Sequence, residues 1–255
     1  MTSALFSHGL SDIGLVRAGN EDSMFFSDGP VGCLPNLYVV ADGMGGHNAG
    51  EIASREAVRF FIERIESASS KADDYLDTLV GGVSYANSRV YGMSLSQQPL
   101  RGMGTTFSAC VIADKKIYIA HVGDSRVYMS DGYEMTQLTA DHTYVSEMVR
   151  AGALTPRQAM THEKRGMLTR ALGTSAEIQI DALARELPGE CVILLCSDGL
   201  TNMLPDARIH KILLGGADAA AAAAELIGEA NNNGGSDNVT AIVIQSRFDE
   251  GGVSV

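Results

Sequence analysis

The strongest chemical signal in the sequence is a carboxylate that directly follows a short apolar run. Residues 37–50 read LYVVADGMGGHNAG, in which Leu37 to Ala41 are apolar and Asp42 comes next. A run of this length, rich in Val and Tyr, predicts a buried strand, and the glycines after it let the backbone approach a ligand closely. A carboxylate beside bare backbone suits a hard cation that prefers oxygen ligands. The alternative is an ordinary strand-to-helix turn with a solvated aspartate, and this stretch alone favours neither.

The same pattern recurs twice, far away in the chain. Residues 191–197 (CVILLCS) form another apolar strand candidate that ends at Asp198, and Asp237 lies just before the strand candidate VTAIVIQS at 239–246. These aspartates and Asp42 therefore lie where predicted strands start or finish, and they converge if the strands share a sheet region. Unpaired carboxylates gathered in one cleft repel one another, so a metal ion is the natural neutraliser.

The composition limits the classes of function. The chain has 255 residues, 45% of them hydrophobic, which is enough for one large domain. A formal net charge of −12 argues against a nucleic-acid binder and against a polybasic membrane patch. No secretory signal is visible at the N-terminus, and no apolar run is long enough to span a bilayer. The four cysteines form no CxxC pair, which favours free thiols over disulfides or a zinc site, so a soluble cytoplasmic protein is expected.

Periodicity predicts the elements that would position these residues. The predicted helices span residues 50–65, about 76–91, 206–214 and 217–230. Asp73 or Asp74 is expected to cap the second helix, and the Gly81–Gly82 pair weakens its predicted continuity. Strand candidates separated by tight turns between residues 105 and 139 indicate an antiparallel meander. Strands paired in hairpins together with two pairs of helices suggest an α+β layered fold, although periodicity does not determine the strand order.

Eight motifs occur in an order that points to a family. They are RAGNED, VVADGMGGHNAGE, GMGTT, HVGDSRVY, TADHT, LTRALG, CSDGLT and GGSDNVT. Together they resemble the bacterial PP2C-type (PPM) serine/threonine phosphatases over nearly the whole chain, from about Gly14 to Val243. The resemblance implies a four-layer αββα sandwich of two antiparallel sheets flanked by helix pairs, in a single domain that covers residues 1–255. It also implies an enzyme that hydrolyses phosphoserine and phosphothreonine in proteins.

The resemblance further implies two divalent ions, Mn²⁺ or Mg²⁺, in a core site. Asp42 would bridge both ions, and the backbone carbonyl of Gly43 would bind the second. Asp198 and Asp237 would bind the first ion. These are the oxygen ligands that such cations prefer.

Other residues receive supporting roles from the same resemblance. Glu21 and Asp22 would hold metal-bound waters, and the planar fork of Arg17 would pair with the substrate phosphate. Bacterial members often bind a third ion, which Asp141 would hold together with Asp198. Residues of about 143–173 would form a mobile flap near that position, and the alternative is a well-packed helical excursion.

The chemistry implied by the resemblance starts from a water that bridges the two ions. Such a water loses its proton near neutral pH, attacks the phosphorus in line as hydroxide, and expels the alkoxide without a covalent intermediate. The ions and Arg17 would stabilise the charge on the phosphoryl oxygens. The partners would be phosphorylated proteins, whose phosphorylation an opposing serine/threonine kinase supplies. Nucleic acids and membranes are not expected as partners, and the protein is expected to be a monomer.

The general acid for the leaving group is not identified by the sequence. Some eukaryotic relatives carry a histidine after the Asp-Gly pair, but Met44 occupies that position here. His47 is a nearby candidate, although a loop histidine more often makes a local hydrogen bond. His142 and His162 are weaker candidates in the region of the flap.

Three further residues have competing interpretations. Asp124 is acidic enough for a metal site, but its place in a hairpin turn favours a structural role. Arg170 could approach the cleft, and the preferred interpretation is a salt bridge that anchors the flap. Cys196 precedes Asp198 by two residues, but its apolar neighbours favour a core thiol over a nucleophile.

Two rival functions are weighed against the phosphatase. A non-catalytic relative with the same fold would have lost a metal carboxylate or the phosphate arginine, and none of these is missing. A two-metal hydrolase of phosphodiesters or small phosphorylated metabolites is excluded only through the resemblance.

Overall fold

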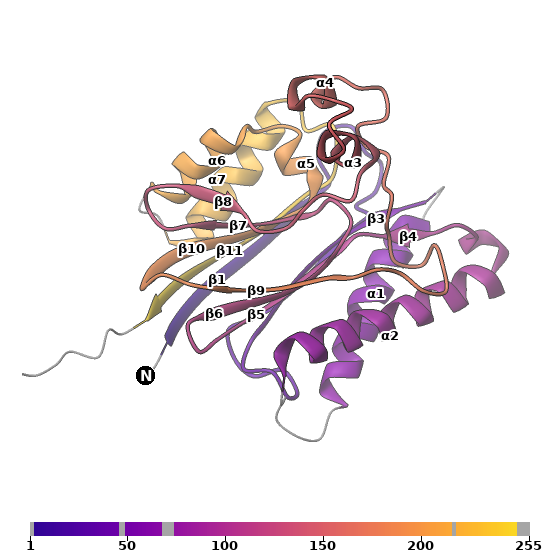
Figure 1. Ribbon diagram of the computed structural model, residues 1–255, viewed down its shortest axis with the longest axis horizontal. Coiled ribbons are helices and arrows are strands. Elements are labelled where there is room, and N and C mark those ends of the chain that lie inside the picture. The colour runs from indigo at the N-terminus through magenta and orange to yellow at the C-terminus, as the bar shows by residue number, and fades with distance from the viewer. Residues whose placement is uncertain (1–2, 46–48, 68–73, 216–217, 249–255) are drawn as a thin grey trace, which may run out of the picture.

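Two antiparallel sheets pack face to face, and helices cover both outer faces (Figure 1). The computed structural model describes residues 3–45, 49–67, 74–215 and 218–248. The first sheet has the strand order β1-β11-β10-β7-β8, and the second has the order β2-β3-β5-β6-β9, with β4 paired to β3. This arrangement confirms the αββα sandwich that the motifs imply.

The bounds of the strands follow the chain. The first sheet consists of β1 (Ser3–Asp12), β11 (Val239–Phe248), β10 (Glu190–Cys196), β7 (Arg126–Ser130) and β8 (Met135–Gln137). The second consists of β2 (Asp22–Ser27), β3 (Leu37–Met44), β5 (Phe107–Ala113), β6 (Lys116–Val122), β9 (Asp181–Glu186) and the short β4 (Gly104–Thr105).

The helices form the two outer layers and the flap. The helices α1 (Ala49–Glu66) and α2 (Tyr75–Ser96) cover the second sheet, and α2 leads into a 3₁₀ turn at Gln98–Leu100. The first sheet is covered by α5 (Asp198–Thr201), α6 (Asp206–Leu213) and α7 (Ala219–Asn232). The flap contains α3 (Tyr144–Arg150) and α4 (Pro156–Met160), which lie beyond one end of the sandwich (Figure 1).

Burial on both faces explains why the central strands read as unbroken apolar runs. In β3, Tyr38 and Val40 pack between the two sheets, whereas Val39 and Ala41 pack against the helix layer. A strand of this kind lacks the alternation of apolar and polar residues found in half-exposed strands. The continuous run from Leu37 to Ala41 is the consequence.

The second helix is continuous, in contrast to the interruption that its glycine pair suggested. Gly82 faces α1, and a Cβ built on it would lie 2.6 Å from Cε2 of Phe61. This glycine therefore allows α1 and α2 to pack closely. The N-cap expectation is confirmed at Asp74, whose side chain accepts hydrogen bonds from the N–H groups of Leu76 and Asp77. Asp73 lies outside the described residues.

The edge strand β9 was not expected. Half of its sequence, DALARE, is charged and most of it is exposed, and it pairs only with β6 within the described sheet. Among the described residues, no helix is both long enough and apolar enough to cross a membrane.

Candidate active site

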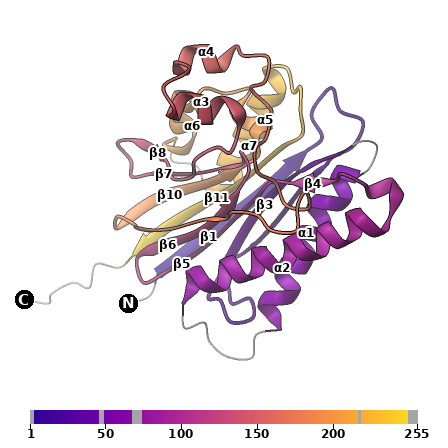
Figure 2. The same ribbon diagram turned by 45° about the vertical axis from the view of Figure 1, so that its right-hand side comes forward.

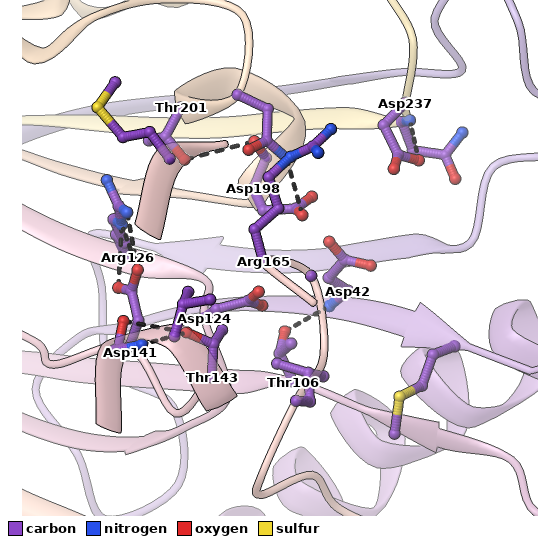
Figure 3. A pocket seen from close by; sticks show the side chains of 18 of the residues that line it. Asp42, Thr106, Asp124, Arg126, Asp141, Thr143, Arg165, Asp198, Thr201 and Asp237 are labelled. Atoms are coloured by element: carbon purple, nitrogen blue, oxygen red, sulfur yellow. Dashed lines mark hydrogen bonds and ion pairs between the residues drawn. The ribbon is translucent and has the colours of Figure 1, made fainter. Parts of the chain in front are cut away.

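Strand ends from both sheets meet at one end of the sandwich. Asp22 and Asp42 are direct partners in the β2–β3 ladder, while Asp198 follows β10 and Asp237 precedes its neighbour β11. Asp42, Asp198 and Asp237 line one cavity of about 1130 Å³ (Figure 3). The other acidic residues that line this cavity include Glu21, Asp124, Asp141, Glu163 and Asp206.

The glycines after Asp42 and Asp198 allow the loops to approach closely. A Cβ on Gly43 would overlap the carbonyl oxygen of Gly50, and a Cβ on Gly199 would overlap the carbonyl oxygen of Asn238. Any other residue at these positions would therefore push the neighbouring backbone away. The Asp-Gly pairs that the sequence repeats are thus required by the packing of the cavity wall.

Asp22 is buried and only partly satisfied. Its Oδ2 accepts hydrogen bonds from Ser197 Oγ and Thr240 Oγ1, both at 2.7 Å. Its Oδ1 is buried without a hydrogen-bond partner. Burial raises the pKa of this carboxyl to about 7, and the charges of Asp198 and Asp237 also raise it. An orphaned carboxylate oxygen next to an acidic cavity is what a bound cation, or a water held by one, would satisfy.

The carboxylates of the cavity destabilise one another's charged form. Burial raises the pKa of Asp42 well above its ordinary value, and the charges of Asp22 and Asp198 add to this effect. Burial also raises the pKa of Asp198, followed by the charge of Asp237. Carboxylate and carbonyl oxygens are the donor set of a hard divalent cation such as Mg²⁺ or Mn²⁺, so the residues present fit one.

The acidic side chains surround the cavity without closing into a compact cluster. In the part of the chain that the structure describes, no three His, Cys, Asp or Glu side chains are positioned to hold one ion by themselves. A site for cations at this place would thus also need backbone carbonyls, waters or small side-chain movements.

Arg17 lies in the loop between β1 and β2 and lines the cavity. Its Nη2 donates to Asp237 Oδ2 at 2.7 Å, and its side chain is 46% exposed. The buried side chain of Asn238 holds this loop in place. Its Nδ2 donates to the carbonyls of Ile13 and Gly19, both at 2.9 Å, and its Oδ1 accepts from the N–H of Glu21 at 2.8 Å.

The expected third-ion residue, Asp141, lies at the cavity but is held by other side chains. Arg126 donates to both of its oxygens, through Nε to Oδ1 at 3.0 Å and through Nη2 to Oδ2 at 2.7 Å. Gln137 Nε2 donates to Oδ1 at 2.8 Å. The charge and the oxygens of Asp141 are therefore largely satisfied within the protein.

Asp124, in contrast to Asp141, forms no ion pair among the described residues, although its turn position favoured a structural role. Burial raises its pKa to about 8, and the next largest contribution is the charge of Asp198. It lines the cavity near Thr106 and Asp141 (Figure 3). The turn dipeptide was the only sequence signal at this position, and it does not reveal which way the side chain points.

The flap contributes a residue that sequence reasoning missed. Arg165 extends from the flap into the cavity, on the same side as Asp198 (Figure 3). At the base of the flap, Arg170 forms the expected salt bridge, with Nη1 donating to Asp181 Oδ1 at 2.8 Å. Thr169 N–H donates to the carbonyl of His142 at 2.8 Å, so the two ends of the flap are joined.

The histidines considered as general acids do not line the cavity where they are described. The ring of His142 is fully buried, accepts a hydrogen bond from the N–H of Gly123, and faces Asp181 at 3.1 Å. His162 accepts from the N–H of Lys164 within the flap. His47 lies in residues 46–48, outside the described residues. The general acid is therefore not identified.

An αββα sandwich with acidic strand ends gathered in one cavity defines the architecture expected from the motifs, that of a PP2C-type phosphatase. The sequence model of the family described as protein phosphatase 2C matches residues 17–229. The chain belongs to this family, and the expected enzyme class, protein phosphatase, is confirmed.

Individual relatives are similar to this chain in sequence and structure over most of its length. The serine/threonine phosphatase stp of Listeria monocytogenes is 35% identical over 242 residues, which cover 92% of this chain and 93% of that protein. The crystal structure of the Mycobacterium tuberculosis serine/threonine phosphatase PstP/Ppp has a TM-score of 0.86 at 36% identity and covers 96% of this chain and 99% of that one. A PstP catalytic domain in complex with two manganese ions has a TM-score of 0.84 at 36% identity, covering 96% of this chain and all of that one.

Proposed function

We propose that the protein is a phosphatase that removes phosphate from phosphoserine and phosphothreonine in proteins, and that it depends on two divalent cations, Mn²⁺ or Mg²⁺. The observation that carries this proposal is the convergence of Asp42, Asp198 and Asp237 on one cavity from strand ends of both sheets. The relatives named serine/threonine phosphatases and the two manganese ions of the PstP complex support it.

Residues from both sheets would hold the cations. Asp42 and the Gly43 carbonyl would hold them from one sheet, and Asp198 and Asp237 would hold them from the facing sheet. Asp22, through its free buried oxygen, and Glu21 would hold waters around them. The cations would supply a water of lowered pKa as the nucleophile and would neutralise phosphoryl charge.

The chain's own arginines would position the substrate. The guanidinium of Arg17 lines the cavity while one nitrogen binds Asp237, so a phosphate there would meet a preoriented, planar donor. Asn238 holds the loop that carries Arg17 and thereby its orientation. From the flap, Arg165 would meet the same phosphate or a neighbouring group of the substrate.

We propose that a third ion, if bound beside Asp198, uses Asp124 more than the Asp141 expected from the motifs. Asp124 lies near the charge of Asp198 and forms no ion pair within the described residues, whereas Asp141 is paired with Arg126. Asp124→Asn should remove one bound Mn²⁺, and Asp141→Asn should leave the number of bound ions unchanged. Calorimetric titration of each variant with Mn²⁺ counts the ions, and an ion lost only in Asp141→Asn contradicts the assignment.

The proposed function predicts metal-dependent hydrolysis with a preference for phosphopeptides. The purified protein should hydrolyse a phosphothreonine peptide with Mn²⁺, should lose this activity in a chelator, and should regain it when Mn²⁺ is returned. A phosphodiester substrate under the same conditions is the comparison that separates this function from a two-metal diesterase. Full activity in the presence of the chelator would overturn the proposed mechanism.

The finer expectations on partners and location belong to the same proposal. Substrates would be phosphoproteins made by an opposing serine/threonine kinase, and the protein would act as a monomer. All four cysteines are free thiols, three of them buried, which supports a reducing compartment such as the cytoplasm. The fold would form one domain over residues 1–255, including the flap at 143–173.

A further inference from the structure

Two apolar side chains next to Arg17 in the chain are largely exposed to solvent. Leu15 is 70% exposed and Val16 is 69% exposed, and they immediately precede Arg17 in the chain. Single exposed apolar residues are common on protein surfaces, but adjacent ones at the edge of a functional cavity mark interaction sites. Leu15 and Val16 differ from scattered exposed apolar residues because they adjoin Arg17, which lines the cavity.

The backbone of this loop is held firmly, so the exposure is not the result of a loose segment. The N–H of Leu15 donates to the carbonyl of Gly235 at 2.7 Å, and the N–H of Gly14 donates to Asp12 Oδ1 at 2.8 Å. Asn238 binds the carbonyls on both sides, at Ile13 and Gly19. The Leu15 side chain lies against the glycine loop at Gly235 on one side, and most of its surface, like that of Val16, stays in water.

A third exposed apolar side chain comes from the flap. Met160, in α4, is 75% exposed and lines the cavity. The loop between β1 and β2 and the flap both lie at the end of the sandwich where the cavity opens (Figure 2). Methionine adapts its shape to different apolar partners. Apolar contacts are thus available on the flap as well as beside Arg17.

We propose that Leu15, Val16 and Met160 form a docking surface for apolar residues that flank the phosphorylated serine or threonine of the substrate. This inference rests on the proposed function, because it places the phosphate in the cavity beside Arg17. A phosphorylated side chain in the cavity brings the residues before and after it close to Met160, which lines the cavity, and to Leu15 and Val16, which adjoin Arg17 in the chain. Burying apolar surface there makes the peptide bind better than its phosphate alone would.

Continuity with the cavity favours a substrate over a second copy of the chain as the occupant. Met160 lines the cavity, and Leu15 and Val16 adjoin Arg17, which also lines it. The exposed side chains of Phe6, Leu95 and Tyr133 neither line the cavity nor adjoin Arg17 in the chain. The net charge of −12 disfavours flanking residues that are themselves acidic. Neutral apolar flanks carry no such repulsion.

The test compares two phosphothreonine peptides that differ only in the flanking residues, leucine and valine in one and serine in the other. The protein with Mn²⁺ should hydrolyse the apolar peptide with a kcat/KM about tenfold higher, the scale expected when two or three apolar side chains are partly buried. The double variant Leu15→Ser, Val16→Ser should reduce this ratio to near one, mainly through KM. Met160→Ser should reduce it partially.

Leu95→Ser is the matched control, because Leu95 is 69% exposed on α2 and neither lines the cavity nor adjoins Arg17 in the chain. It should keep the full ratio. An unchanged ratio in the double variant, or no preference in the unaltered protein, overturns the docking surface while leaving the phosphatase intact. Hydrolysis of neither peptide overturns the proposed function and the docking surface with it. A variant that changes the sedimentation of the protein but not the ratio overturns the proposal in favour of a contact between copies.

Discussion

Asp42→Asn should lower the turnover of a phosphothreonine peptide by at least about a thousandfold, because an amide cannot supply the bridging charge that two cations require. In metal-free buffer the same variant should be at least as stable as the unaltered protein. The reason is that Asp42 is buried beside the charges of Asp22 and Asp198, and the amide removes this repulsion. Steady-state kinetics and thermal unfolding in chelator measure these two quantities, and calorimetric counting of Mn²⁺ should show fewer bound ions than in the unaltered protein.

Arg17→Ala supplies the contrast for this experiment. Arg17 lines the same cavity and pairs with Asp237, but its proposed role is to hold the phosphate rather than a cation. Its loss should mainly raise KM and should leave the number of bound ions as it was. If Asp42→Asn instead behaves like Arg17→Ala, with normal ion binding and a change confined to KM, the assignment of Asp42 is wrong.

The fold could be predicted wherever burial leaves a clear pattern in the residues. The core strand β3 is buried on both faces, so its apolar run is continuous and easily recognised. Helices α1 and α7 are buried along one side, so their buried apolar positions recur at the helical period. The edge strand β9 has one neighbour in the described sheet and a largely exposed sequence, half of it charged, so neither hydrophobicity nor alternation distinguishes it from a loop.

The candidate site could be predicted only as far as local motifs determine side-chain direction. Asp42 lies near the end of the buried strand β3, Asp198 follows β10, and each precedes a glycine, so the local pattern places both at a strand end. Asp124 and Asp141 offer no comparable signal. Which of them forms an ion pair depends on Arg126, which binds Asp141, fifteen residues further along the chain. A single sequence does not show such pairing.

Gly199→Ala should destabilise the protein by about 3 kcal/mol, a large value for the addition of one methyl group. Gly199 follows Asp198 in α5, and its Cβ would overlap the Asn238 carbonyl, which is backbone and has no rotamer to change. Relief requires the segments that carry Asp198 and Asp237 to separate. The variant should therefore also bind Mn²⁺ more weakly, and thermal unfolding together with calorimetric titration tests both effects.

Gly228→Ala in α7 separates this clash from a general effect of replacing glycine. No heavy atom lies within 4 Å of the Cβ position of Gly228, so alanine there should stabilise the helix by about 0.5–1 kcal/mol and should leave Mn²⁺ binding unchanged. The opposite signs of the two glycine substitutions follow from one cause, the distance between the added methyl group and the facing backbone. Two results would contradict this account: equal stabilities in the two variants, or an unchanged Mn²⁺ affinity in Gly199→Ala. Either would show that the cavity wall adjusts without moving Asp198. The close approach of these two loops would then not be what positions the carboxylates.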